Sequence, residues 1–258
     1  MSTLPRVETR VWDLPPRLFH WSLVLLVGIN LFLIGPRGGL DTVIHFVAGY
    51  LVLGLLVFRL AWGFVGSPRS RFRDFVHRWP AVSAYLGRLA RFDPPHSVGH
   101  NPVGGWMIML LLAILGTMIA TGLFATGRHG AGPLAVLLPV AWTAIAGSIH
   151  ELVSNLLIGL IIVHVAGVAA EWLLTGDNLV RAMLNGRKRL DPEVAARERP
   201  VAPVGRAVIV GLVAAALVGL LVAATDFTAN RESLRALEAG GPAPSAALTT
   251  APLPIDTD

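Results

Sequence analysis

The sequence contains no cysteine and few charged residues, and both scarcities narrow what the protein can do. Without cysteine the chain can form no disulfide, hold no thiolate-ligated iron–sulfur cluster and attach no haem through a Cys-x-x-Cys-His motif. Charged side chains make up only 14% of the 258 residues, whereas apolar side chains make up 54%. With a mean hydropathy of +0.65, this composition indicates an integral membrane protein.

Acidic residues are fewer than basic ones, 16 against 21, and the net charge is +5. In a membrane protein such a basic excess normally marks the topology of the loops. We therefore expect no nucleic-acid partner, and membrane lipid is the first partner that the composition predicts.

Five apolar stretches approach the roughly 20 residues that a helix needs to cross the hydrocarbon core. Lipid offers the backbone no hydrogen-bond partners, so each stretch is predicted to be helical. The fold class is therefore predicted as all-α, an integral membrane four-helix bundle with an appended fifth transmembrane helix. The predicted spans are Leu18–Ile34, Thr42–Phe64, Val103–Phe124, Ile149–Leu174 and Ala207–Ala224.

Basic residues concentrate in two of the loops, after the second and the fourth spans, whereas the loops after the first and third spans carry only Arg37 and Arg128. The positive-inside rule then predicts a cytoplasmic N-terminus and an outer C-terminus. No small-residue cleavage site follows the first span, so we expect it to stay as an anchor. The residues of the two basic loops are Arg69, Arg71, Arg73, Arg78, Arg88 and Arg91, then Arg181, Arg187, Lys188, Arg189, Arg197 and Arg199.

The chain divides into four predicted parts. Residues 1–190 form the four-helix transmembrane domain, 191–205 a cytoplasmic linker, and 206–225 the fifth transmembrane helix. The Pro/Ala/Thr-rich residues 226–258 lack apolar periodicity and are predicted to be a disordered or partner-binding tail on the outer side. The whole stretch from Gly186 to Arg206 is interpreted as solvated.

Four histidines lie inside or at the edges of the predicted spans, where ionisable groups are costly and tend to mark function. His150 and His164 are fourteen residues apart on one helix, about 21 Å of rise and nearly whole turns. The topology places His20 at the depth of His164, and His45 at the depth of His150. Two stacked histidine pairs are the arrangement that two b-type haems need, with His20 and His164 on the inner iron and His45 and His150 on the outer iron.

Small residues and one arginine fit a flat macrocycle between the helices. Glycines near the histidines would let a porphyrin approach the backbone, and Arg17, one turn from His20, is the first candidate for contact with a haem propionate. The rival interpretations are histidines that only bridge helices, glycines that only pack helices, and a metal site without porphyrin. Two pairs a bilayer apart do not make one compact zinc or copper site. The glycines are Gly28, Gly49, Gly159 and Gly167, and Arg59 and Arg91 are further propionate candidates.

Structural or solvent-exposed positions are predicted for the remaining titratable groups. His100, at the start of the third span, is interpreted as a helix cap, with acceptance of a proton from quinol as the alternative. Glu151 and Glu171 are membrane-edge carboxylates that orient helices or, alternatively, relay protons. The other histidines are expected to be solvated in the basic loop, for His77 and His96, or to lie in an outer loop, for His129.

Several stretches resemble the bacterial di-haem cytochrome b proteins, which comprise the cytochrome b subunit of nickel–iron hydrogenases and the cytochrome b-561 type. The resemblance covers roughly Val11 to Arg189 and implies the same histidine pairs, a bacterial inner membrane location, and electron transfer between membrane quinone and an outer redox partner. The fifth span and the tail depart from the family pattern. The matching stretches are "VWDLPPRLFHWSLVLL", "IHFVAGYLVLGLLVFRLAWGFVGSPRSRFRDF", "GHNPVGGWMIMLLL", "HELVSNLLIGLIIVHVAGV" and "DNLVRAMLNGRKR".

The function predicted from these observations is electron transfer across the membrane by a di-haem cytochrome b, between the quinone pool and an outer c-type cytochrome or an oxidoreductase subunit such as a hydrogenase. The protein would position the cofactors and tune their potentials. One alternative is a self-contained quinone oxidoreductase that reacts with superoxide or another small oxidant. Another is a non-redox scaffold or transporter, and a homodimer is left open.

Overall fold

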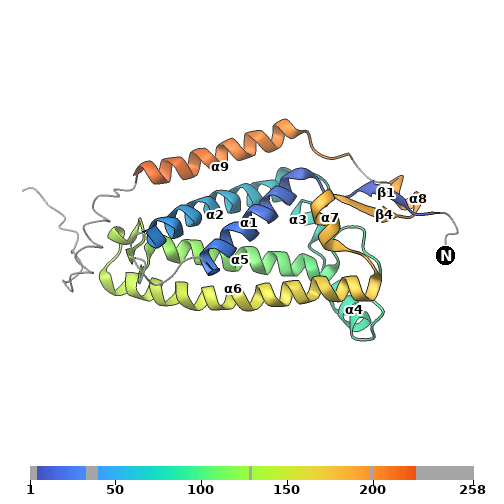
Figure 1. The fold of residues 1–258 in the computed structure, drawn as a ribbon, viewed down its shortest axis with the longest axis horizontal. Helices are drawn as coiled ribbons and strands as arrows, with labels where there is room; N and C mark the ends of the chain where they lie inside the picture. Colours follow the sequence, from blue (N-terminus) through green and yellow to red (C-terminus); the bar gives the residue numbers. More distant parts are fainter. Residues whose placement is uncertain (1–4, 33–39, 128–129, 198–199, 225–258) are drawn as a thin grey trace, which may run out of the picture.

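The computed structural model describes residues 5–32, 40–127, 130–197 and 200–224 of the chain. Within these residues, five helices are long and apolar enough to cross a membrane, which confirms the predicted spans and the all-α class. They are α1 (Leu14–Phe32), α2 (Leu40–Val65), α5 (Pro102–Phe124), α6 (Val140–Thr175) and α9 (Val204–Ala224), shown in Figure 1.

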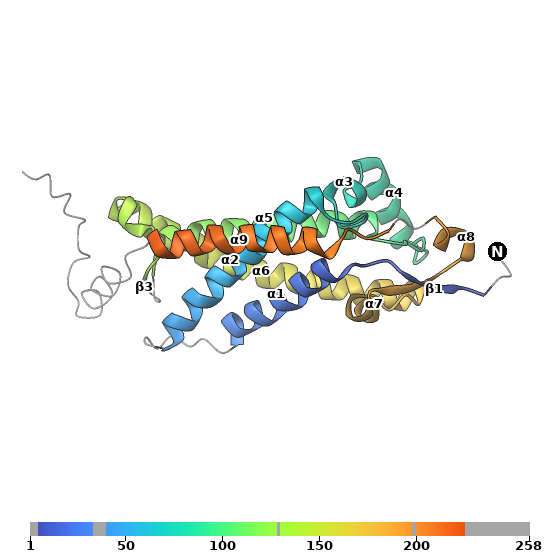
Figure 2. The same cartoon turned by 90° about the horizontal axis from the view of Figure 1, so that it is seen from above.

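The five long helices are arranged as two packed pairs with one helix outside them. Helix α1 packs against α2, and α5 packs against α6, while α2 also contacts α5 and joins the two pairs. The fifth helix, α9, lies along α2 on the side away from α6 (Figures 1 and 2). The space between the two pairs is therefore where side chains of α1 and α2 can face those of α6.

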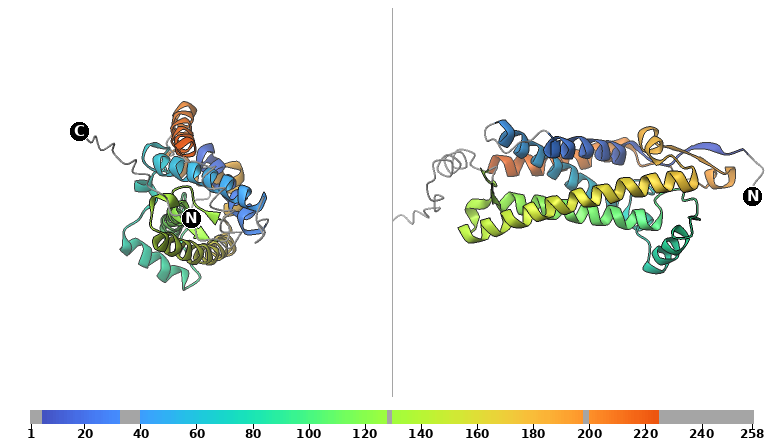
Figure 3. Two further views of the ribbon diagram at one scale, coloured as in Figure 1. Left: turned by 90° about the vertical axis from the view of Figure 1, so that its left-hand side faces the viewer. Right: turned by 60° about the horizontal axis from the view of Figure 1, so that its bottom comes forward.

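One end of the bundle, where α1 begins and α2 and α6 end, carries the arginine-rich segments, and we call it the basic end. Here β1 (Val7–Arg10) pairs antiparallel with β4 (Arg187–Leu190), with Val7 opposite Leu190. Helix α4 leans away from the bundle at this end (Figure 3). The short helices here are α3 (Phe72–Phe75), α4 (Trp79–Leu89), α7 (Leu179–Asn185) and α8 (Pro192–Ala195).

The interpretation of Gly186–Arg206 as solvated is wrong for its first residues. Strand β4 alternates exposed and buried residues, with Lys188 and Leu190 only 7% and 8% exposed. Leu190 belongs to a small core with Val11, Trp12 and Ala182. Val11 and Trp12, which help to cover this short strand, lie far away in sequence, so the charged stretch alone does not indicate its burial.

Gly186 connects the basic end to the start of α1. It adopts a left-handed conformation with φ of 79°, which ends α7 and which side-chain-bearing residues rarely adopt. Its carbonyl oxygen accepts hydrogen bonds from the backbone N–H groups of Val11 and Trp12, at 2.9 and 3.0 Å. The entry of α1 into the bundle is thereby held against α7.

At the opposite end, which we call the hairpin end, α6 starts at Val140 and not near Ile149 as predicted. Pro139 precedes its first residue, and the helix packs against the hairpin of β2 (Thr126–Gly127) and β3 (Gly130–Ala131), which follows α5. The 3₁₀ helix η1 (Ala135–Leu137) completes this connection. With 36 residues, α6 is about 54 Å long and exceeds the roughly 30 Å hydrocarbon core.

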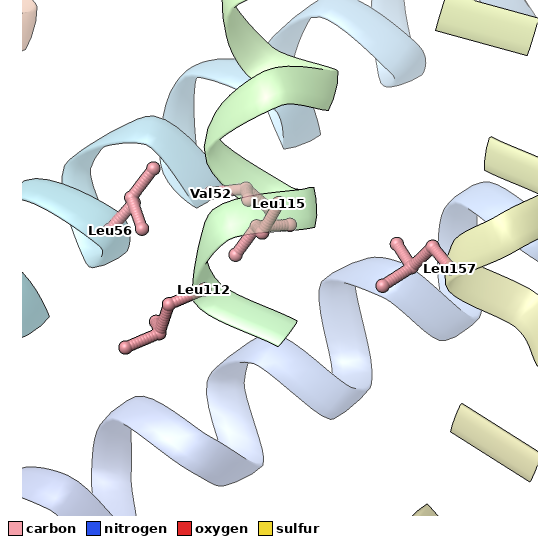
Figure 4. Packing of buried hydrophobic residues seen from close by; sticks show 5 residues of the cluster. All are labelled: Val52, Leu56, Leu112, Leu115 and Leu157. Carbon is pink, nitrogen blue, oxygen red and sulfur yellow. The ribbon is translucent and has the colours of Figure 1, made fainter. Parts of the chain in front are cut away.

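Aliphatic side chains of α2, α5 and α6 form a buried layer (Figure 4). Leu157, its member on α6, lies seven residues from His150 and seven from His164 and is 5% exposed. Partly buried side chains of α1, among them Phe19 and Leu23, pack against the layer. It therefore separates the two levels of histidines. Its fully buried members are Val52, Leu56, Leu112, Leu115 and Leu157.

Candidate functional site

The four span histidines lie in two pairs, one at each end of the core. The ring centroids of His20 on α1 and His164 on α6 are 6.4 Å apart, and those of His45 on α2 and His150 on α6 are 6.1 Å apart. All four rings are partly buried. The structure thus brings together the same partners that helix periodicity and topology predict.

These separations match two imidazoles on opposite sides of one metal ion. Metal–imidazole bonds are about 2 Å long and a ring centre lies about 1 Å beyond its nitrogen, so two opposed rings have centroids about 6 Å apart. Within the described ranges, no three His, Asp or Glu side chains cluster as a metal site. Two imidazoles alone would leave a bare ion under-ligated, whereas a porphyrin supplies four nitrogens in the plane between them.

A cavity of about 550 Å³ surrounds the His45–His150 pair, a volume within the range of cofactor pockets. Both histidines line it, together with Gly49 of α2 and Gly122 of α5. A Cβ added to Gly49 would meet no atom within 4 Å, so the cavity extends to the backbone of α2. The residues present therefore fit a flat macrocycle at this level.

Helix α5 fixes the orientation of the His150 imidazole. Its Nδ1 lies 2.9 Å from the carbonyl oxygen of Met118 and 3.4 Å from the hydroxyl of Thr121. A carbonyl oxygen only accepts, so Nδ1 carries the proton and donates it, and Nε2 keeps a free lone pair. A backbone carbonyl on the second nitrogen is the usual support for a metal-ligating histidine.

Gly122 makes the close approach of α5 to His150 possible. A Cβ at this position would lie 2.9 Å from Cε1 and 3.1 Å from Nδ1 of His150, closer than carbon atoms normally pack. Any larger residue would therefore press on the imidazole. The absence of a side chain at Gly122 is a structural requirement of this histidine position.

At the His20–His164 level the fit rests on the facing rings and on an unsatisfied atom. Nδ1 of His20 is buried and has no hydrogen-bond partner among the described residues. A Cβ on Gly28, Gly159 or Gly167 would meet nothing within 4 Å. Gly159 and Gly167 are exposed and Gly28 lies eight residues after His20, so these three glycines do not define a pocket at this level.

Arg17 lies one turn before His20, as predicted, but its side chain contacts helix α7. Its Nε donates to the carbonyl oxygen of Met183 at 3.1 Å, and its Nη2 donates to that of Leu184. These carbonyls belong to the last turn of α7, where cations are favourable. Contact of Arg17 with a haem propionate stays a prediction. Arg91 follows α4 and is exposed.

Glu171 continues the inward face of α6 that carries Leu157 and His164, seven residues after His164. It is 4% exposed and accepts hydrogen bonds from the Tyr85 hydroxyl at 2.6 Å and from Nδ2 of Asn101 at 3.1 Å. Burial and the bond to Glu171 raise the pKa of Tyr85. Asn101 also caps α5 by accepting from the N–H of Gly104. Glu171 thus connects the end of α6 to α4 and α5.

His100 lies in an aromatic cluster, two residues before the start of α5. Its ring centroid lies 4.4 Å from that of Trp12 and 4.9 Å from that of Phe75. Burial, and then the positive charges of Arg59 and Lys188, lower the pKa of His100 to about 3. His100 is therefore neutral at physiological pH. The N-cap itself is the neighbouring Asn101.

Acid should destabilise the protein through His100. The folded imidazole stays neutral down to about pH 3, whereas in the unfolded chain it binds a proton below its ordinary pKa of 6.5. Its contribution to stability is complete above pH 6.5 and is lost as the pH falls from 6.5 towards 3. Lowering the pH from 7 to 5 should reduce the free energy of unfolding by up to about 2 kcal/mol.

Thermal unfolding of the wild type and of His100→Phe at both pH values measures this effect. Phenylalanine keeps an aromatic ring between Trp12 and Phe75, so the variant should lose this part of the pH dependence. An equal loss of stability in the two proteins would show that other groups are responsible.

The other titratable groups have varied surroundings. His77 is half-buried, not solvated as predicted, with Nδ1 2.8 Å from the Phe75 carbonyl oxygen. His96 is 51% exposed and lies 3.6 Å from Asp177. Glu151 lines the cavity beside His150. His129 lies outside the described residues.

Met118, Thr121 and Gly122 were not predicted from the sequence, although they position His150. Their only signal in the sequence is a small and polar Thr-Gly pair near the end of an otherwise apolar helix, which equally suits helix packing. Which face of α5 meets His150 depends on the contact between two helices, and periodicity does not reveal it.

The model of the family described as prokaryotic cytochrome b561 matches residues 11–186. Three similar proteins are named as probable Ni/Fe-hydrogenase B-type cytochrome subunits. That of Azotobacter chroococcum mcd 1 is 25% identical over 68% of this chain and 86% of its own length.

The relative from Rhizobium leguminosarum bv. viciae is 23% identical over 72% of this chain and 91% of its own length. The relative from Escherichia coli strain K12, whose name specifies hydrogenase 1, is 26% identical over 70% and 90% respectively. No solved structure matches significantly. The matched family segment contains all four span histidines.

Proposed function

The chain belongs to the prokaryotic cytochrome b561 family and is a b-type cytochrome of a bacterial membrane, and on this premise we propose that it holds two b haems and carries electrons across the membrane. One haem would lie between His20 and His164 and the other between His45 and His150. The observation that carries this proposal is the spacing of the two pairs, 6.4 and 6.1 Å between ring centroids.

A bis-histidine haem supplies one-electron redox chemistry at its iron. The chain contributes the geometry that this chemistry needs. The Met118 carbonyl holds His150 with Nε2 free, Gly49 and Gly122 line the cavity at the His45–His150 level, and the Leu157 layer lies between the two levels. Four imidazoles on three helices also fix both levels relative to each other, since His150 and His164 share the rigid helix α6.

The proposed orientation puts the basic end in the cytoplasm. Both arginine-rich loops predicted to be cytoplasmic belong to this end, and the positive-inside rule favours that side for them. The His20–His164 haem would then face the cytoplasm and the His45–His150 haem the outer side. The N-terminus would be cytoplasmic and the C-terminus outer.

We propose the quinone pool as one redox partner and an oxidoreductase on the outer side as the other. The names of the relatives, which are hydrogenase cytochrome subunits, support a partner of this class, and an outer c-type cytochrome is the alternative partner. We also propose that residues 191–205 form a cytoplasmic linker, that 206–225 form the fifth transmembrane helix, and that 226–258 form an outer tail. The tail lies outside the described residues.

Purified full-length protein tests the proposal directly. We expect two protohaems per chain, both low-spin, and both reducible by a short-chain quinol in lipid vesicles. Fewer than two haems would contradict the two-site assignment, and haems that no quinol reduces would contradict the quinone assignment. Reaction with superoxide at full rate, without any added partner, would favour the self-contained oxidoreductase.

Co-purification then identifies the partner. A hydrogenase found with the protein in mild detergent would support an outer oxidoreductase, and a c-type cytochrome would support the alternative donor or acceptor. A homodimer would appear as a doubled mass with unchanged haem content per chain. Protein that purifies alone and turns over quinol alone would argue against any obligatory partner.

A further inference from the structure

Arg59, near the end of α2, is a buried arginine that forms no ion pair with any residue in the described part of the chain. Its side chain is 4% exposed, and its guanidinium carbon lies 5.1 Å from the centre of the Phe72 ring and 5.6 Å from that of Phe75. Its Nη1 is buried and has no hydrogen-bond partner in the described part of the chain. A buried cation without an anion is costly, and a bound carboxylate would satisfy it.

The position of Arg59 follows from the spacing along α2. It comes fourteen residues after His45, the same separation as between His150 and His164 on α6. Both helices run from the hairpin end to the basic end (Figure 1), and His45 faces His150 at their start. Fourteen residues along each helix therefore bring Arg59 to about the depth of His164.

Asp13 is an acidic residue whose charge attracts that of Arg59. It is 6% exposed, and its Oδ1 accepts a hydrogen bond from Ser70 at 2.8 Å. Its Oδ2 is buried without a hydrogen-bond partner in the described ranges. Arg59 and Asp13 are thus two buried charged residues that attract each other, but no direct ion pair joins them in the described part of the chain.

Arg17 and Arg59 differ in what their guanidinium groups already bind. Arg17 donates from Nε and Nη2 to the carbonyl oxygens of α7. Arg59 lies over the Phe72 and Phe75 rings and has a buried Nη1. Among the described residues, no acceptor reaches this Nη1, whereas Arg17 already has two acceptors.

We propose that Arg59 is the carboxylate-binding and potential-setting cation of the His20–His164 haem. The inference rests on the proposed function, because it takes a haem at that level as given. Haem carries carboxylate side chains, and one of them would accept from Nη1. Reduction adds one negative charge to the site, so a buried cation favours the reduced form and a buried carboxylate at Asp13 opposes it.

Redox titration of the full-length holoprotein tests this. In a His150→Leu background only the His20–His164 haem remains to be titrated. There, Arg59→Gln should lower the reduced-to-oxidised ratio at a given potential about tenfold, which is ~59 mV for a one-electron couple. Arg59→Lys, which keeps the charge but not the planar fork, should shift it less. Asp13→Asn should shift it the opposite way.

The controls separate this inference from its premise. Arg59→Gln in a His164→Leu background should leave the potential of the remaining haem unchanged. Arg88→Gln, at an exposed arginine that pairs with Asp93, should leave the His20–His164 haem unchanged. If Arg59→Gln fails to fold, the opposite signs expected for Arg59→Lys and Asp13→Asn still decide the matter. Two haems present but insensitive to both charges would overturn this inference alone, whereas fewer than two haems in the wild type would overturn the proposed function.

Discussion

Replacing His164 with leucine should halve the haem content of the purified protein and leave one bis-histidine haem in place. Leucine has a similar volume and suits a membrane helix, so α6 should keep its packing. His20 would then face no second imidazole across the 6.4 Å gap, and a haem held on one side only is lost readily during purification. The pyridine haemochrome assay, referred to protein concentration, measures the change.

Two further variants make this result specific. His150→Leu should also halve the haem content, but should remove the other haem, so the double variant should bind none. His96→Leu is the matched control, because His96 is 51% exposed in a loop and lies 3.6 Å from Asp177. Haem content that stays at the wild-type value in His164→Leu would refute the assignment of this ligand.

Replacing Gly122 with alanine should release the haem of the His45–His150 level without weakening the helix. The added Cβ would lie 2.9 Å from Cε1 of His150, and the imidazole cannot retreat without breaking its bond to Met118. Metal–ligand distances tolerate only about 0.2 Å of error. We therefore expect a fall towards one haem per chain, measured by the same assay.

Gly116→Ala is the matched control on the same helix. A Cβ at Gly116 would lie 3.8 Å from Leu56, an ordinary contact, so haem content should not change. Alanine favours a helix over glycine by up to about 1 kcal/mol, so neither variant should melt at a lower temperature for backbone reasons. Equal haem content in the two variants would show that the approach of α5 does not constrain His150.

The His164→Leu and Gly122→Ala substitutions affect separate histidine levels. His150 and His164 are both on α6, but the aliphatic layer around Leu157 lies between them. A change at one level should therefore leave the other nearly intact, since distant sites without shared partners act additively. This independence would let each haem be titrated alone, as the Arg59 experiment requires.

Much of this architecture was predictable because it depends on local patterns. Apolar runs of about twenty residues specify membrane helices wherever they occur, and the five spans are confirmed. The pairing of His20 with His164 and of His45 with His150 follows from topology and helical rise, and the structure places these rings side by side. Ligation of haem by them stays a prediction.

Several features could not be predicted because they depend on contacts between distant segments. The strand at Arg187–Leu190 exists because β1 and the core around Trp12 cover it. The early start of α6 is accompanied by packing against the hairpin after α5. The sequence places Glu171 at the end of a span, but only its hydrogen bonds with Tyr85 and Asn101 show that it connects α6 to α4 and α5.

By itself the sequence determined the membrane class, the number of spans and the depth of each histidine, because hydrophobicity and helical rise are properties of a single segment. Only the tertiary structure showed that Arg59 has a buried Nη1 without an acceptor among the described residues. It also showed that the Met118 carbonyl holds His150 and that Gly122 leaves room for the imidazole. These features concern distances between helices. Such distances are set by the packing of whole surfaces, and no single segment encodes them.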